Sequence, residues 1–556
     1  MKKSRNKPQN RKTKINVTNN LSIGEIYIGE IDTTIELRMG GISASNDFFN
    51  SYYVKDEKDI ENFLAGKKCF VYGQKGAGKT AFLRYVGEKL KKEKDIQNHT
   101  IMYSFIEDFP EQAHREITEF AIQSRSEHSK KVGRDINIFR DLDYEDFWTY
   151  LILHSVNKYL QNNGKDLVVD DNNLKSFRSQ LSNIDNGSIQ DRLLKLVPRV
   201  ANLKAQISAN PSLTTDITFK DGEKEFAKFS THVEKMREQF LKLTWLKGRV
   251  YFMFDEIDPR VGSGKAFDLD CILIRDLIHV IYRLNASSAT EERRIFFAAA
   301  IRSEVLRSVD KLGKEIHKTL SQLGVHMNWG HYGQLNTDHP LVSMLCKKII
   351  YSENRKGIHT ELGLRPNDTI WNKYFRKNLQ DSLEVKDLFR LTWLKPRDLV
   401  RIINTCKIIE PSSKFIGSSL VQRARTIYSN DSWNEIQSQL NTSLSPGEIE
   451  ALDMVLTRFF DEFNVHEFKK KIMDLITVNT KIDGLLEHRK EGDLLEIMYI
   501  YGIVGNKVGN IHRFYYRGDE TPQIAEPFVL HAGLWKKFSP VRRSRMKDPL
   551  QSEFKL

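Results

Sequence analysis

The fold is decided by the stretch Gly73-Gln74-Lys75-Gly76-Ala77-Gly78-Lys79-Thr80. It fits the pattern G-x-x-x-x-G-K-[ST], in which a glycine-rich turn directs several backbone N–H groups at one anion. Residues 67–73 (KKCFVYG) form a short β-rich run that predicts a buried parallel strand, and residues 81–94 (AFLRYVGEKLKKEK) have helical spacing. A strand before the loop and a helix after it are the context that phosphate binding requires.

The loop residues have separate expected roles. A helix that begins near Gly78 adds the positive end of its dipole to the anion site. Lys79 should reach the β- and γ-phosphates of a nucleoside triphosphate, and Thr80 should place its hydroxyl on Mg²⁺. The predicted nucleotide-binding residues in this segment are Gly73, Gln74, Lys75, Gly76, Ala77, Gly78, Lys79, Thr80 and Ala81.

A second candidate segment is Phe252-Met253-Phe254-Asp255-Glu256. A carboxylate at the end of a buried apolar strand is unfavourable unless it meets a cation. We expect Asp255 to hold Mg²⁺ through water and Glu256 to act as the base that polarises the attacking water. The alternative is the solvated start of a loop, and the glycine-rich loop upstream makes it the weaker interpretation.

Two arginines are weaker candidates. Arg302 follows the apolar run IFFAAAI, and strand ends of this kind border the ligand crevice of an α/β sheet, so Arg302 could sense the γ-phosphate. Pro396 can open a helix, which would place Arg397 in the first turn, where its charge requires an anion or a carboxylate nearby. The alternatives are an ordinary surface arginine for Arg302 and a salt bridge, to Asp398 or between domains, for Arg397.

Composition and charge limit the class of protein. The 556 residues include 86 Lys and Arg against 73 Asp and Glu, a net charge of +13, and basic residues cluster at 2–14 and 542–547. Such a surplus favours polyanionic partners such as DNA, while the alternative for both clusters is a solvated tail. The four cysteines lie far apart, which disfavours a zinc site or a disulfide framework and predicts a cytoplasmic protein. No apolar run approaches the ~18 residues of a membrane span.

The pattern along the chain predicts an α/β protein with a parallel sheet. The expected parts are a disordered basic tail at 1–20, an ATPase core at 21–310, a helical lid at 311–440 and a helical, winged-helix-like domain at 441–556. Within the core, residues 110–247 are expected to form a helical insertion with a flexible, polar portion at about 162–222. Residues 24–39 alternate apolar and polar side chains, which predicts one or two short strands.

These motifs resemble the additional-strand, catalytic-glutamate P-loop ATPases, the group that holds the AAA+ and STAND proteins. GQKGAGKT resembles the Walker A motif, FMFDE the Walker B motif, AAAIR the sensor-1 strand with the terminal arginine of STAND ATPases, and LKPRDLVRIIN the lid helix. The resemblance covers about residues 46–405 and implies ATP and Mg²⁺ as cofactors. It implies catalytic roles for Lys79, Glu256 and Arg302, nucleotide contact by Arg397, and metal contact by Thr80 and Asp255.

The C-terminal segment LLEIMYIYGIVGN…RFYYRG…FVLHAGLWKKF resembles a winged-helix domain, and the alternative is a small structural or protein-binding module. Tyr515 and Tyr516, next to Arg513 and Arg517, could stack on bases. The preferred alternative is alternation on a wing strand with one tyrosine buried. Glu384-Val385-Lys386 spells a nuclease-like ExK, but its helical context indicates a solvated face.

Three functions follow as hypotheses. The first is an ATP-hydrolysing switch that relays nucleotide state to a protein effector or DNA, and similarity to prokaryotic ATPases of antiphage-defence or DNA-repair loci favours antiviral defence. The second is a DNA-binding ATPase of replication or repair. The third is a scaffold that senses a phage protein through the 110–247 insertion. The expected partners are ATP, a protein effector or further copies of the chain, and DNA, with no membrane.

Overall fold

The computed structural model divides the chain into two compact units. One contains residues 1–53, 329–438 and 450–556, and the other contains residues 54–328 and 439–449. Below, the second is called the sheet unit and the first the lid unit. The structure describes residues 20–93, 98–104, 144–163, 167–182, 222–246, 248–257, 265–287, 294–310, 316–330, 335–376, 378, 380–441, 443–479, 482, 484–487, 489–509 and 511–543.

Five parallel strands form the centre of the sheet unit. They are β1 (Phe70–Gly73), β2 (Asn98–Ser104), β3 (Arg249–Ile257), β4 (Ile295–Arg302) and β5 (Gly324–His326). Their order is β2-β3-β4-β1-β5, so β4 lies between the strand before the glycine-rich loop and the strand that carries Asp255. This arrangement confirms the predicted α/β fold with a parallel sheet and an additional central strand.

The central strands form because both of their faces are covered. In β4 every residue except Arg302 is buried, and β3 is buried at most positions, as expected for continuous apolar runs in a parallel sheet. Phe252 and Phe297 stack across the pair with ring centroids 5.7 Å apart. Around the sheet lie α2 (Glu57–Leu64), α3 (Lys79–Lys91), α11 (Lys265–Ser287), α12 (Ser303–Asp310) and α13 (Ile316–Leu323).

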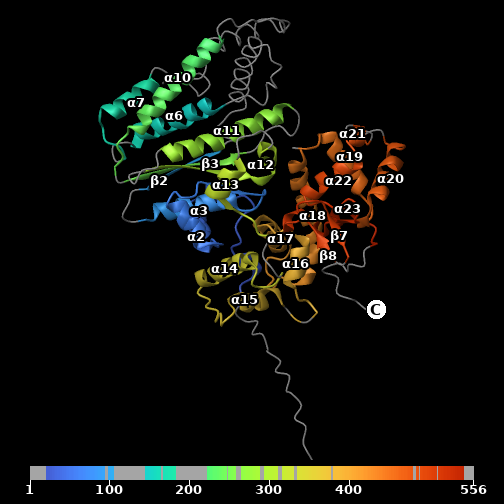
Figure 1. Cartoon of the computed structure of the whole chain (residues 1–556). Helices are drawn as coiled ribbons and strands as arrows, with labels where there is room; N and C mark the ends of the chain where they lie inside the picture. The colour runs from blue at the N-terminus through green and yellow to red at the C-terminus, as the bar shows by residue number, and fades with distance from the viewer. Residues whose placement is uncertain are drawn as a thin grey trace, which may run out of the picture. The chain divides into compact units, whose positions relative to one another are not determined.

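Three further helices belong to the predicted insertion. They are α6 (Glu145–Asn163), α7 (Asn172–Ser182) and α10 (Gly222–Leu241), and they lie together beside α11 (Figure 1). The α7 helix falls within the polar stretch at about 162–222, so residues 172–182 belong to the helical part of the insertion. Within the insertion, residues 110–143, 164–166, 183–221 and 247 lie outside the described residues.

The insertion shares the hydrophobic core of the sheet unit. The indole nitrogen of Trp148 donates to the Leu273 carbonyl of α11 at 2.8 Å, and the Tyr144 amide donates to the Asp276 carboxylate at 2.8 Å. Side chains of α6 and α10 join those of β3, β4 and α11 in one buried cluster. The insertion therefore stabilises the sheet rather than standing apart from it.

The lid unit contains helices from three segments of the chain. An N-terminal segment holds η2 (Ile23–Glu25) and α1 (Thr33–Ser51), followed by α14 (Pro340–Arg355), α15 (Pro366–Phe375), α16 (Val385–Leu391), α17 (Pro396–Ile409) and α18 (Ser418–Leu440). The strands predicted within 24–39 are wrong, because the Asp32 carboxylate accepts from the amides of Thr34 and Ile35 and starts a helix there.

The N-terminal segment belongs with the lid helices by its hydrogen bonds. The Tyr27 amide donates to Ser352, Lys407 donates to the Ile26 carbonyl, and Tyr351 donates to Asp47. The sequence predicts that the ATPase core starts at residue 21. In the structure, residues 21–53 group with the lid helices, and the sheet unit starts at residue 54. The basic tail predicted at 1–20 lies outside the described residues except for Asn20.

The C-terminal part of the lid unit has winged-helix topology, as predicted. Its chain order is α19 (Pro446–Leu456), β6 (Glu462–Phe463), α20 (Val465–Ile476), α21 (Gly484–Glu487), α22 (Glu491–Ile500), β7 (Val504–Val508), β8 (Ile511–Arg513) and β9 (Phe528–Leu530). The antiparallel sheet has the order β6-β9-β7-β8, with the wing between β7 and β9. Short turns η5 (Tyr515–Arg517), η6 (Ala532–Leu534) and α23 (Trp535–Phe538) complete it.

A buried tryptophan joins the lid helices to the winged helix within this unit. The Trp393 indole stacks on His531 with ring centroids 4.0 Å apart and donates to the Gly502 carbonyl at 2.8 Å. A Cβ atom at Gly502 would lie 2.7 Å from the Trp393 ring, so that position has no room for a side chain. The close fit explains why both parts belong to one compact unit.

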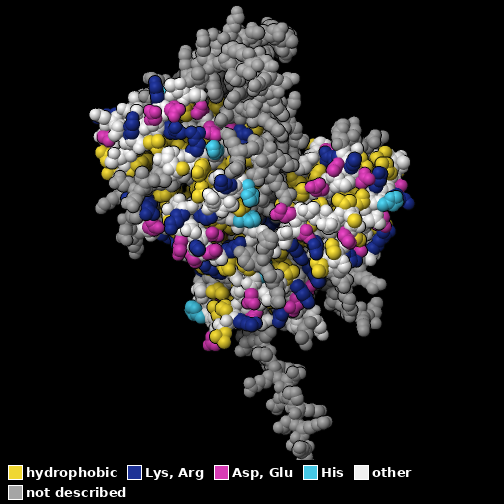
Figure 2. Space-filling model, viewed as in Figure 1, with side chains coloured by type: hydrophobic (Ala, Val, Ile, Leu, Met, Phe, Trp, Pro, Cys, Tyr) yellow, Lys and Arg dark blue, Asp and Glu magenta, His cyan; other side chains and the backbone are white. Residues whose placement is uncertain are grey.

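No helix in the part of the chain that the structure describes combines the length and apolar content that a bilayer crossing needs. Figure 2 shows Lys and Arg side chains mixed with Asp and Glu across the visible described surface. On that face the positive charges of the described residues do not gather into one large patch.

Replacing Trp148 with Phe tests the anchoring of the insertion. The change removes the indole N–H that donates to the buried Leu273 carbonyl, so we expect the free energy of unfolding of the sheet unit to fall by about 0.5–1.5 kcal/mol. Urea titration followed by circular dichroism measures it. The control is Trp245→Phe, at a half-buried tryptophan, which should change little; equal effects of the two would contradict the role given to the Trp148 hydrogen bond.

Candidate functional site

The glycine-rich loop connects the end of β1 to the start of α3. Gly76 and Gly78 have φ values of 82° and 93°, in the left-handed region that favours glycine. Gly78 is the N-cap of α3, so the loop delivers the chain to the positive end of that helix. The backbone therefore has the curled form that the sequence motif predicts.

Gly73 has a steric reason to be glycine. The Met327 amide, just past β5, donates to the Tyr72 carbonyl at 2.8 Å and brings Met327 close to the loop. A Cβ atom on Gly73 would lie 2.7 Å from the Met327 carbonyl oxygen. Any larger residue would force the start of the loop away from the sheet edge.

Lys79 is the first residue of α3, and its ammonium group lies against the loop. The Nζ atom donates to the carbonyl oxygens of Gly73 at 2.9 Å and Gln74 at 3.0 Å. Thr80 follows as the second helical residue. Both side chains that the sequence assigns to phosphate and metal contact thus project from the first turn of the helix.

Asp255 and Glu256 lie at an irregularity in β3. The register with β4 shifts between Phe254 and Ile257, and Glu256 has φ 57°, which is uncommon for a residue other than glycine. Asp255 is buried, with 6% of its surface exposed, and one of its carboxylate oxygens accepts the Glu256 amide at 2.9 Å. A bulge of this kind redirects side chains at a strand end, and the positive φ of Glu256 places local strain in the backbone there.

Strand register brings Arg302 next to the loop. In the parallel pairing of β1 with β4, Gly73 and Arg302 are direct partners, and β3 lies on the other side of β4. Neighbouring strands are about 4.8 Å apart, so β1 and β3 are separated by about 10 Å. Gly73, Arg302 and the Asp255–Glu256 bulge therefore share the carboxyl edge of the sheet. Asp258 and Arg260, which follow the bulge in the sequence, lie outside the described residues.

Arg397 belongs to the lid unit and forms a salt bridge there. It is the second residue of α17, and its guanidinium donates to Glu435 of α18 at 2.8 Å, while Arg401 donates to the other carboxylate oxygen. Burial alone would raise the pKa of Glu435, but the two arginines lower it to about 2. The nearby Asp398 carboxylate accepts the Trp393 amide instead of pairing with Arg397. The anion that the helix start requires is thus supplied by Glu435.

The oxygen atoms that the side chains offer at the sheet edge suit a Mg²⁺ ion that is also bound by the phosphates of a nucleotide. No group of three His, Cys, Asp or Glu side chains suited to a metal ion occurs among the residues that the structure describes. Mg²⁺ typically takes one or two protein oxygens and completes its shell with phosphate and water. Thr80 and Asp255 are residues of this type.

Sequence reasoning missed a group of basic side chains in the lid unit. Lys386, Arg390, Lys507, His512 and Arg517 line one pocket although they come from distant segments. Lys386 is exposed on a helix, as its sequence context predicts, and no sequence signal indicates that β8 meets α16. Of the two wing tyrosines, Tyr516 is buried and Tyr515 half-buried, as the alternative reading expected, although both lie on a 3₁₀ turn rather than a strand.

Comparisons with known proteins give only distant similarity. The structure of the Aeropyrum pernix ORC2 protein in its ADPNP–ADP complexes is 12% identical, with a TM-score of 0.36, over 91% of this chain and 93% of that chain. The structure of CDC6P from Pyrobaculum aerophilum is 10% identical, with a TM-score of 0.28, over 89% of this chain and 98% of that chain. No protein-family model matches the sequence, and no curated protein matches it.

The fold assignment accordingly rests on the geometry itself. A parallel sheet in the order β2-β3-β4-β1-β5, a glycine-rich loop after β1 and a carboxylate pair near the end of β3 define a P-loop NTPase core.

The Arg397–Glu435–Arg401 cluster predicts a pH-dependent stability of the lid unit. Because the pKa of Glu435 is lowered, its stabilising effect is complete above the ordinary value of 4.5 and is lost as pH falls towards 2. Glu435→Gln should lower the free energy of unfolding by about 3 kcal/mol at pH 7, since it leaves two arginines without their carboxylate.

Urea unfolding at pH 7 and pH 3.5 should show this difference from wild type shrinking at the lower pH. The control is Glu410→Gln, which removes the exposed partner of Arg423 and should change stability by about 1 kcal/mol or less. A difference for Glu435→Gln that is the same at both pH values would contradict the assignment of the low pKa.

Proposed function

We propose that the protein binds and hydrolyses ATP at the carboxyl edge of the sheet. The observation that carries the proposal is the convergence of three features there. The glycine-rich loop ends in Lys79 and Thr80, Gly73 and Arg302 are register partners, and the β3 bulge presents Asp255 and Glu256. These groups supply a phosphate cradle, a cation beside it, and two carboxylates with different surroundings.

The residues divide the chemistry between them. The amides of residues 74–79 and the Lys79 ammonium would neutralise the β- and γ-phosphates. Thr80 and Asp255 would hold Mg²⁺, which when bound neutralises charge that develops on the phosphates. Glu256, next in the bulge, would accept a proton from the attacking water, and Arg302 would stabilise the γ-phosphate in the transition state.

In this proposal the nucleotide acts as a switch. Hydrolysis would change the contacts of the loop and of Arg302, and the lid unit would relay the change to a protein partner or to further copies of the chain. The salt bridge of Arg397 to Glu435 gives this arginine a structural partner, so its contact with nucleotide requires that pair to open. The assignment to STAND proteins and the role in antiviral defence stay predictions from the sequence resemblance.

A second candidate is a DNA-binding ATPase, which the winged-helix topology favours. However, α22, which follows α20 in the position of a recognition helix, exposes Asp493 and Glu496 and contains no lysine or arginine. Two carboxylates facing a DNA groove would be repelled by the phosphates. We therefore rank a protein partner above DNA for the winged helix.

Lys79→Ala tests the first proposal. Loss of the ammonium that contacts the loop should abolish ATP binding, measured by isothermal titration calorimetry with Mg²⁺. Glu256→Gln should keep ATP binding and lower the hydrolysis rate by about 10²–10⁴-fold, measured by phosphate release. The matched control is Lys91→Ala, at the other end of the same helix, where the lysine is exposed and pairs with Glu88. Full ATPase activity of Lys79→Ala would overturn the proposal.

Neutralising α22 tests the ranking of the second candidate. If α22 does not face DNA, the double change Asp493→Asn and Glu496→Gln should leave duplex affinity and its salt dependence unchanged in fluorescence anisotropy. Deletion of residues 2–14, with their seven basic residues, should remove most of the salt-dependent binding. A rise in affinity on neutralising α22 would instead place that helix at the DNA.

A further inference from the structure

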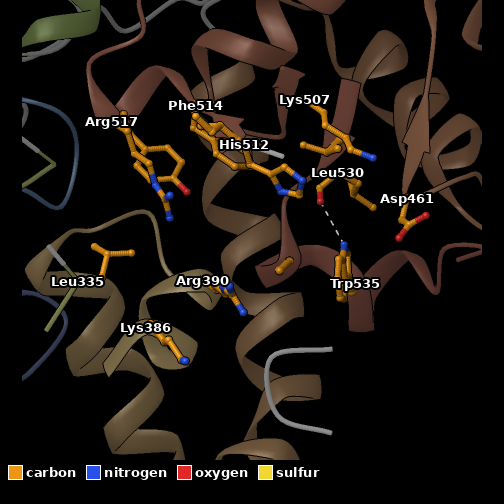
Figure 3. Close-up of a pocket in the computed structure, with 14 residues that line it drawn as sticks. Leu335, Lys386, Arg390, Asp461, Lys507, His512, Phe514, Arg517, Leu530 and Trp535 are labelled. Carbon is orange, nitrogen blue, oxygen red and sulfur yellow. Dashed lines mark hydrogen bonds between the residues drawn. The ribbon is translucent and has the colours of Figure 1, made fainter. Parts of the chain in front are cut away.

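A pocket of about 550 Å³ lies within the lid unit, between α16 and the outer face of the winged-helix sheet. Figure 3 shows Lys386 and Arg390 on one side, with His512, Lys507 and Arg517 on the opposite side. Its apolar floor includes Phe514, Val529, Ala532 and Trp535. All of these residues belong to the lid unit, so the pocket is distinct from the glycine-rich loop.

Secondary structure explains why the basic residues converge. Lys386 and Arg390 are four residues apart on α16 and therefore share one face of that helix. Lys507 of β7 and His512 of β8 are cross-strand partners, and Val529 of β9 lies on the same face because it is opposite Gly505. Arg517 enters from the 3₁₀ turn that follows β8.

The positive charge of the pocket is only partly compensated. Lys507 pairs with Glu462 at 2.8 Å, and the pocket residue Asp461 is paired with Arg542 at 3.0 Å. Arg390 pairs with Asp387 of the same helix at 3.4 Å. Among the described residues Lys386 and Arg517 form no ion pair, and the buried Nε atom of Arg517 has no hydrogen-bond partner.

The surroundings of His512 and Arg517 also show an excess of positive charge in the pocket. Burial lowers the pKa of His512, and Lys507, Arg517 and Arg390 lower it further against the opposing effect of Glu462. The Arg517 guanidinium lies 5.7 Å from the ring centroids of both Phe514 and Tyr516, which holds it at the apolar floor. The pocket thus combines fixed cations with a hydrophobic wall.

We propose that this pocket binds a nucleotide-sized ligand that carries phosphoryl groups and an aromatic or other apolar ring. Lys386, Arg390 and Arg517 would contact the phosphoryl oxygens, because lysine and arginine form strong charge-assisted hydrogen bonds to phosphate. The ring would lie on the floor formed by Phe514, Val529 and Trp535.

The size and position of the pocket favour a small ligand over a nucleic-acid strand. Its volume lies within the range of about 300–1,000 Å³ that is typical of small-molecule sites. It is recessed between α16 and the sheet, and α22 contributes no residue to its lining. The same phosphate chemistry is present in free nucleotides and in pyrophosphate, and the experiment separates these sources.

Equilibrium dialysis of the full-length Lys79→Ala variant, in EDTA, isolates this pocket from the glycine-rich loop. The probes are radiolabelled AMP, ADP and inorganic pyrophosphate. We expect saturable binding, with the nucleotides bound more tightly than pyrophosphate because only they have a ring for the apolar floor. Adding Lys386→Glu and Arg390→Glu should weaken binding at least tenfold. The matched control adds Lys414→Glu and Lys470→Glu, two exposed lysines of the same unit outside the pocket.

The outcomes are distinct from those of the ATPase proposal, since the Lys79→Ala background removes the loop site from all measurements. Quenching of Trp535 fluorescence by ADP, absent in Trp535→Phe, would locate the ligand at the floor. Failure of all three probes to bind, or binding that the charge reversals leave unchanged, would overturn the proposal. Binding of a 20-nucleotide single strand in place of the probes, lost on the same reversals, would assign the pocket to nucleic acid and would overturn it as well.

Discussion

The proposed chemistry depends on one constraint, which is the parallel pairing of β4 between β1 and β3. This pairing makes Gly73 and Arg302 neighbours although 229 positions separate them, and it brings the bulge at Asp255 to the same sheet edge. The segment between β2 and β3 can be long because loop-closure entropy grows slowly with length. The described helices of this segment offset the loop-closure entropy, because they add buried apolar side chains to the core over β3 and β4.

The sequence predicted the sheet unit well for a physical reason. Strands covered on both faces need continuous apolar runs, and the loop needs glycines at fixed spacing, so both leave local signals at 67–80, 248–257 and 293–302. The segment 24–39 misled because its apolar residues alternate as in a strand, while the Asp32 side chain caps a helix. The winged helix was recognisable because its helix, glycine turn and wing follow one another closely in the chain.

Other features of the site depend on partners that no local pattern contains. The positive φ of Glu256 arises where β3 gains a residue relative to β4, and register of that kind is fixed only by pairing. The helix start at Arg397 indicated the need for an anion, but that anion is Glu435, on the next helix. Likewise α16 and the β7–β8 hairpin lie more than 100 residues apart in the sequence, so their shared basic pocket could not be read from either segment.

The C-terminal domain has the winged-helix fold, but its charge distribution does not suit DNA binding by its recognition helix. A winged-helix protein that reads DNA with its recognition helix requires positive charge there, because phosphates dominate the affinity. Here α22 exposes Asp493 and Glu496, while the C-terminal arginines Arg542 and Arg543 are paired with Asp461 and Glu467. Lys386 and Arg517, which form no ion pair among the described residues, line the recess against α16 instead. Within the same unit, Trp393 joins the lid helices to the winged helix. A recess framed by both parts is suited to a ligand whose binding would be sensed by the lid unit as a whole.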